Sequence, residues 1–87
     1  MSQDYVVIEF CEDLEQILAL YTDKDLPPGG ILVWAEGRLK RTVFPDRKSA
    51  RAAIERTHHY AKAFGRDDLP DRSSCKIEPV VYCGDKP

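Results

Sequence analysis

No helix or strand can run through KDLPPGG (24–30), because consecutive prolines and glycines interrupt both. Near the start of the chain, DYVVIEF (4–10) is rich in β-branched and aromatic residues and predicts a strand. DLEQILALYTD (13–23) predicts a helix with Leu14, Ile17, Leu18 and Tyr21 on one face. Asp13 fits its N-cap, with Gln16 completing a capping box.

The remainder of the chain predicts a hairpin, a second helix and a last strand. ILVWAEGRLKRTVF (31–44) suits two strands that turn at Gly37-Arg38, with Trp34 opposite Arg41 and Val33 opposite Thr42. A helix is expected from Asp46, as N-cap, to about Phe64, with Gly65 as its stop. CKIEPVVYC (75–83) reads as a strand, and Pro79 favours an edge position.

The predicted order of strand, helix, strand, strand, helix, strand is that of a ferredoxin-like α+β fold. The expectation is βαββαβ, a four-stranded antiparallel sheet with two helices on one face and the last strand at an edge beside the first. A chain of 87 residues has too little length for a second core, so residues 1–87 are expected to form a single domain.

Charge is distributed very unevenly along the chain. Residues 1–36 hold eight acids and one base, whereas residues 37–66 hold nine bases and two acids, and the formal net charge of the whole is only −2. The predicted acidic face consists of Glu12, Asp13, Glu15, Asp23 and Asp25. The predicted basic face consists of Arg38, Lys40, Arg41, Lys48, Arg51, Arg56, His59, Lys62 and Arg66.

Three interpretations of the basic face stay open. It is a solvated helix surface, alone or neutralised by the acidic segment; a site for a polyanion such as nucleic acid; or half of a charged protein-docking surface. The leading hypothesis is a protein-interaction or regulatory module with an unidentified protein partner. Nucleic-acid binding through the outer face of the second helix is the alternative.

VFPDRKSARAAI (43–54) resembles the passage from the third strand to the second helix of the RNA-recognition motif, at Phe44, Ala50 and Ala53-Ile54. That family stacks nucleic-acid bases on aromatic side chains of its sheet. GRLKRTVF (37–44) has Leu39 and Arg41 at the positions of those aromatics, so the chain is not assigned to the family.

The hairpin has apolar residues on both faces, so one apolar face must point away from the helices. The predicted contact face consists of Tyr5, Val7, Val33, Thr42, Phe44 and Tyr82. A homodimer formed through this sheet face is the simplest use of such a surface.

No motif points to catalysis, a cofactor or a metal. Cys11, Cys75 and Cys83 lack close pairing, and His58-His59 point about 100° apart on a helix. The expectation is therefore a protein that is not an enzyme, with no cofactor and no metal site. No segment suits a membrane span or a signal peptide, so a cytoplasmic location is expected.

Overall fold

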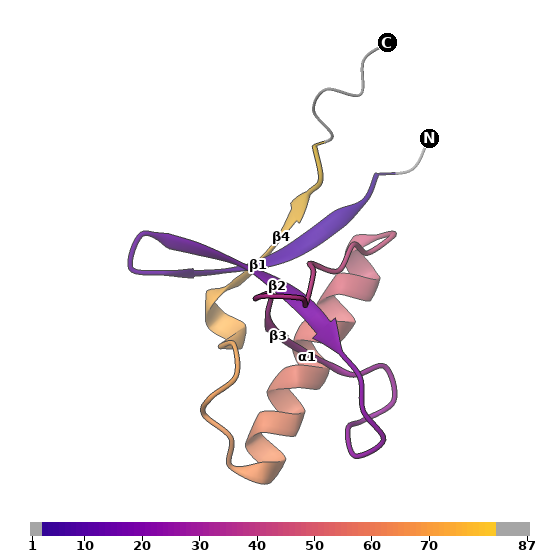
Figure 1. Cartoon of the computed structure of the whole chain (residues 1–87), viewed down its shortest axis with the longest axis vertical. Coiled ribbons are helices and arrows are strands. Elements are labelled where there is room, and N and C mark those ends of the chain that lie inside the picture. The colour runs from indigo at the N-terminus through magenta and orange to yellow at the C-terminus, as the bar shows by residue number, and fades with distance from the viewer. Residues whose placement is uncertain (1–2, 82–87) are drawn as a thin grey trace.

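The computed structural model describes residues 3–81. In these residues four strands form one antiparallel sheet in the order β3-β2-β1-β4, and a single long helix packs on one face of it (Figure 1). The elements are β1 (Tyr5–Cys11), β2 (Leu14–Tyr21), β3 (Ile31–Trp34), α1 (Arg47–Phe64), a 3-10 turn (Arg72–Ser74) and β4 (Cys75–Pro79). Within the described residues the order is β-β-β-α-β, so the ferredoxin-like prediction with two helices is wrong.

The predicted first helix is the strand β2. Residues 14–21 pair antiparallel with β1 on one side and with β3 on the other, from Cys11 opposite Leu14 to Tyr21 opposite Ile31. Asp13 is not an N-cap but, with Glu12, the two-residue turn of a β-hairpin. The apolar run from Ile17 to Tyr21 suits a strand with neighbours on both sides, and this pairing overrides the helix propensity of its Leu, Glu and Gln residues.

The second helix and its caps follow the prediction, whereas the last strand ends at Pro79. Its predicted extension over residues 80 and 81 is wrong, and residues 82 and 83 lie outside the described residues. Asp46 accepts a hydrogen bond from the backbone N–H of Ser49, and Gly65 ends α1 at a φ of 63°. The buried Thr57 hydroxyl links α1 to β3, because it accepts a hydrogen bond from the Leu32 N–H. The same hydroxyl donates to the Ala53 carbonyl within α1. β4 lies at the sheet edge beside β1, as Pro79 indicated.

The predicted hairpin of residues 31–44 is wrong in its second half. Trp34 lies opposite Leu18 and Val33 opposite Ala19, both in β2, instead of facing Arg41 and Thr42. Residues 42–44 lie between β1 and β2, which separate beyond the Ile8–Ile17 pair. The Leu20 N–H donates to the Thr42 hydroxyl, and Phe44 exchanges two backbone hydrogen bonds with Tyr5.

The core lies between the sheet and α1. Its buried members are Val7, Leu18, Leu32, Phe44, Ala50, Ala53 and Ile54. Since strand side chains alternate, Val7 and Glu9 face the helix, whereas Val6, Ile8 and Phe10 face away. Val6, Ile8 and Val80 form a second, smaller buried cluster. In the described residues no helix is both long and apolar enough to cross a membrane.

Candidate interaction surfaces

The β1–β2 hairpin projects beyond the rest of the sheet. β4 pairs with β1 only as far as Glu9, and β3 pairs with β2 only from Leu18 onward. Residues 10–17, hereafter the arm, therefore form a two-stranded ribbon that extends to the left in Figure 1. The Ile17 carbonyl, at the base of this ribbon, accepts from the Ala35 N–H at 2.9 Å, and beyond that bond neither outer edge pairs with a strand of the described chain.

The arm exposes large apolar side chains. Phe10 is 44% exposed, Leu14 62% and Ile17 42%. Phe10 and Ile17 lie on the sheet face away from α1 as diagonal neighbours, since Phe10 is opposite Glu15 and Ile17 is opposite Ile8. Lys76 of β4 places its ammonium 5.3 Å from the centre of the Phe10 ring. Sequence reasoning missed this patch because it placed residues 13–23 in a helix.

Acidic side chains surround the tip of the arm. Glu12 and Asp13 form the turn, and Glu15 lies opposite Phe10. All three are exposed. Asp23 and Asp25 of the predicted acidic face lie in the loop after β2, at the opposite end of that strand. The structure thus divides the predicted acidic face into the arm tip and a separate loop.

A hydrogen-bonded carboxylate fixes the base of the arm. Glu9 is buried, its Oε1 accepts from the Trp34 indole Nε1–H at 2.6 Å, and its Oε2 accepts from the Asp71 backbone N–H at 3.0 Å. Both carboxylate oxygens have a donor, as a buried acid requires. The arm therefore leaves the body beside the loop that holds Asp71.

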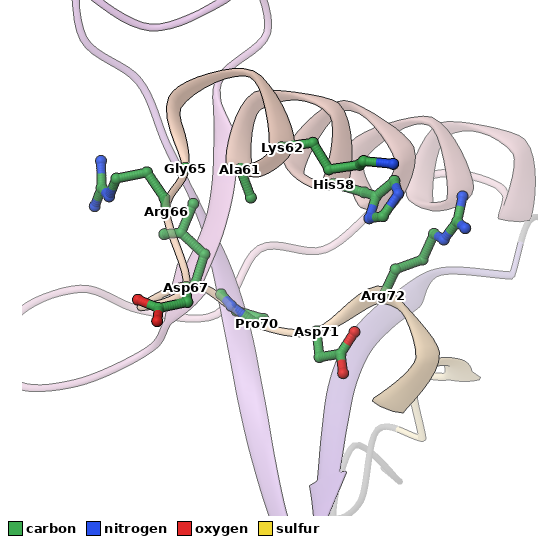
Figure 2. Close-up of a pocket in the computed structure, with 10 residues that line it drawn as sticks. His58, Ala61, Lys62, Gly65, Arg66, Asp67, Pro70, Asp71 and Arg72 are labelled. Carbon is green, nitrogen blue, oxygen red and sulfur yellow. The ribbon is translucent and has the colours of Figure 1, made fainter.

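A groove runs between α1 and residues 66–78. It comprises two depressions, of about 400 and 340 Å³, and Arg72 lines both of them. In Figure 2 the side chains of His58 and Lys62 from α1 and of Arg72 from the opposite wall lie close together. The Arg72 guanidinium donates to Glu55 on α1 at 2.8 Å, across the groove. β4, an edge strand, forms the wall of the second depression.

The predicted basic face is only partly available to a ligand. Arg56 is directed to the loop before β3, donating to the carbonyls of Gly30 and Gly29 at 2.6 and 3.1 Å. Arg66 pairs with Asp68 at 2.8 Å, and its hydrogen bonds hold the pKa of the Asp68 carboxyl below its ordinary value. The remaining members are exposed: Arg38, Lys40 and Arg41 in the loop after β3, and Lys48, Arg51, His59 and Lys62 on α1.

The predicted contact face is not a single surface. Val7 and Phe44 lie in the core, so their predicted exposure is wrong. Tyr5 is partly exposed beneath the Arg47 guanidinium, 4.9 Å from the ring centre, and Val33 is partly exposed on β3. Thr42, partly buried, accepts from the Leu20 N–H. Tyr82 lies outside the described residues.

The cysteines and histidines do not assemble into a site. Cys11 is exposed on the arm, whereas Cys75 is half-buried, and burial together with nearby Glu9 and Asp71 raises its pKa to about 12. Cys83 lies outside the described residues. His58 and His59 contact edge to face, with ring centres 5.8 Å apart. Across residues 3–81, no three His, Cys, Asp or Glu side chains are grouped to hold a metal ion.

Comparisons with known proteins give no match: no protein-family model, no curated protein and no solved structure is significantly similar to this chain.

Proposed function

We propose that this chain is a non-enzymatic protein-binding module and that the arm, residues 10–17, is the element that contacts the partner. The observation that carries the proposal is the exposure of Phe10, Leu14 and Ile17 on a ribbon that no other described strand covers. Burial of one such side chain in an interface is favourable by about 1.5–3 kcal/mol. Phe10 and Ile17 share one face of the ribbon and Leu14, opposite Cys11, lies on the other, so both faces of the arm offer an apolar contact.

The tip of the arm supports this role through its backbone. Glu12 and Asp13 have φ values of 47° and 70°, in the left-handed region that Asn and Gly occupy with least strain. A two-residue turn with both φ values positive strongly favours Asn-Gly. The chain therefore places two acids at the tip at a conformational cost, as is common where strain serves function.

The chemistry of the arm defines the partner. Three carboxylates lie beside three exposed apolar side chains, so the complementary surface is apolar with basic groups around it. The ribbon has open edges, and an added strand of a partner gains backbone hydrogen bonds there. We therefore expect a basic protein surface, bound with a measurable dependence on salt.

Affinity capture with charge-reversed variants tests this proposal. The full chain is immobilised and exposed to a lysate of the organism that encodes it. The arm variant is Glu12→Lys/Glu15→Lys, and the matched control, Asp23→Lys/Asp25→Lys, makes the same charge change in the loop after β2. We expect a protein retained by the wild type and the loop variant and lost by the arm variant, and a purified partner that binds in the same order in direct titration. Equal retention by all three would contradict the proposal.

Nucleic-acid binding is the second candidate. It is favoured by Lys48, Arg51, His59 and Lys62, which are exposed along the outer side of α1. It is weakened because Arg56, Arg66 and Arg72 are engaged with carbonyls or carboxylates of the same chain. Titration of labelled oligonucleotides with the protein distinguishes the two candidates.

A further inference from the structure

The acidic arm and the basic groove are complementary surfaces on one chain. Glu12, Asp13 and Glu15 are exposed on the arm. Six bases and four acids line the two depressions, but Lys76 and Glu78 lie opposite Ile8 and Val6, on the face of β4 that points away from α1. Five bases then remain against three acids, and since Arg66 pairs with Asp68 the walls keep only a small net positive charge. The five bases are Arg47, Arg51, Lys62, Arg66 and Arg72.

Within residues 3–81 the carboxylates of the arm form no ion pair with these bases. The Glu9–Asp71 hydrogen bond holds the base of the arm beside the groove, and the ribbon projects away from α1 (Figure 1). A paired ribbon with a two-residue turn has no hinge by which to fold back. The groove that an arm tip reaches must therefore belong to another molecule.

Contact between the arms of two copies is electrostatically unfavourable. Paired tip to tip, they bring Glu12, Asp13 and Glu15 of one copy against the same residues of the other, and like charges across strands are destabilising. An arm placed in the groove of a second copy instead brings carboxylates to Arg51 and Lys62. The groove is also bordered by β4, which in the described chain pairs only with β1, so its outer edge can receive a strand.

We infer that two copies of this chain associate reciprocally, with the arm of each lying in the α1–β4 groove of the other. The base of the arm and the groove adjoin each other, so a two-fold axis between the copies allows both contacts at once and closes the assembly as a dimer. The inference rests on the proposed function of the arm and names its partner as a second copy.

Sedimentation equilibrium of the full chain, with charge reversal on either side, tests the arrangement. The arm variant is Glu12→Lys/Glu15→Lys, and the groove variant is Arg51→Glu/Lys62→Glu, at two exposed helix positions with no side-chain bond among the described residues. We expect a two-fold mass for the wild type and the monomer mass for each variant alone. An equimolar mixture of the two variants should recover the dimer mass. The quadruple variant, which carries all four substitutions, should also have the dimer mass.

The control Asp23→Lys/Asp25→Lys should remain a dimer, and circular dichroism should verify that each variant is folded. A monomeric wild type at every concentration overturns the inference, as does a dimer that neither variant weakens or a mixture that fails to recover. If the wild type is monomeric but captures a basic protein through the arm, the proposed function stands and only the identity of the partner is wrong. If the arm variants change neither association nor capture, both proposals fail.

Discussion

The indole Nε1–H of Trp34, on β3, donates to the Glu9 carboxylate on β1, across the intervening strand β2, at 2.6 Å. The same carboxylate accepts from the backbone N–H of Asp71, so one buried side chain joins the arm, the edge strand β3 and the loop beside the groove. This contact sets the direction in which the arm leaves the sheet.

Replacement of Glu9 by Gln should destabilise the fold by about 1–3 kcal/mol, because one donor would then face the amide NH2 instead of an oxygen. Urea unfolding followed by the fluorescence of Trp34, the single tryptophan, measures the change next to the hydrogen bond itself. The exposed Glu15→Gln should alter stability by no more than about 0.5 kcal/mol. Equal effects of the two changes would show that the Glu9 bonds contribute nothing.

The turn of the arm should become more stable when its acids are replaced. Glu12→Asn/Asp13→Gly gives the preferred residues for two positive φ values, and we expect a gain on the order of 1 kcal/mol in the free energy of unfolding. The same variant lacks two tip carboxylates and should bind the partner of the arm more weakly. Thermal unfolding and the capture assay measure the two effects. Loss of stability would show that the turn is not of this type.

The two described cysteines should differ sharply in reactivity. The pKa of Cys75 is raised to about 12 by burial and by Glu9 and Asp71, so at pH 8 only about one thiol in ten thousand is the reactive thiolate. Cys11 is exposed. In a Cys83→Ser background, iodoacetamide should modify Cys11 and leave Cys75 intact until the protein unfolds, as mass spectrometry of the peptides reports. Equal labelling in the folded state would contradict the burial of Cys75.

The N-cap of α1 should stabilise the helix in a pH-dependent manner. The pKa of Asp46 lies below its ordinary value of 3.8 because the Ser49 backbone N–H donates to the carboxylate. A lowered folded pKa gives stabilisation that is complete above 3.8 and is lost as the pH falls through the folded value. The midpoint of thermal unfolding of Asp46→Ala should therefore fall below that of the wild type at pH 7, and the gap should narrow below pH 3.8.

Asp46→Asn is the matched control, because its amide oxygen accepts the same bond without titrating. The difference between the thermal unfolding midpoints of Asp46→Asn and Asp46→Ala should not change with pH. A gap between wild type and Asp46→Ala that stays constant down to pH 3 would contradict a role for the charge.

Oligonucleotide binding should be weak and unspecific if the arm is the functional element. Fluorescence anisotropy with labelled single- and double-stranded oligonucleotides, at about 50 and 200 mM salt, should show no tight complex that dissociates steeply with salt. Tight binding abolished by Arg51→Glu/Lys62→Glu and strengthened by Glu12→Lys/Glu15→Lys would favour the nucleic-acid candidate.

Local signals predicted β1, α1 with both caps, and the edge position of β4. They failed for β2, because LEQILALY has high helix propensity and its apolar residues have helical spacing. It forms a strand because it pairs with β1 and β3. The turn before it is Glu-Asp instead of Asn-Gly, so the sequence carries no strong hairpin signal there.

The prediction that Val7 belongs to an exposed contact face failed for a similar reason. Val6, Ile8 and Phe10 are the more apolar set, yet Val7 and Glu9 face the helix. Glu9 can do so because Trp34 and Asp71, 25 and 62 residues away, supply its donors. Exposure on α1 was largely predictable from periodicity, but the use of Arg56 was not, since it depends on the Gly29 and Gly30 carbonyls of a distant loop.

Site-specific photo-cross-linking tests most directly whether the arm is the contact element. A benzophenone side chain replaces Leu14, 62% exposed on the arm, or Phe64, 68% exposed at the end of α1. After illumination in a lysate of the native organism, position 14 should give one discrete adduct, at the mass of a second copy or of a basic partner, and position 64 should give none. No adduct from position 14, or the same adducts from both positions, would contradict a partner bound by the arm.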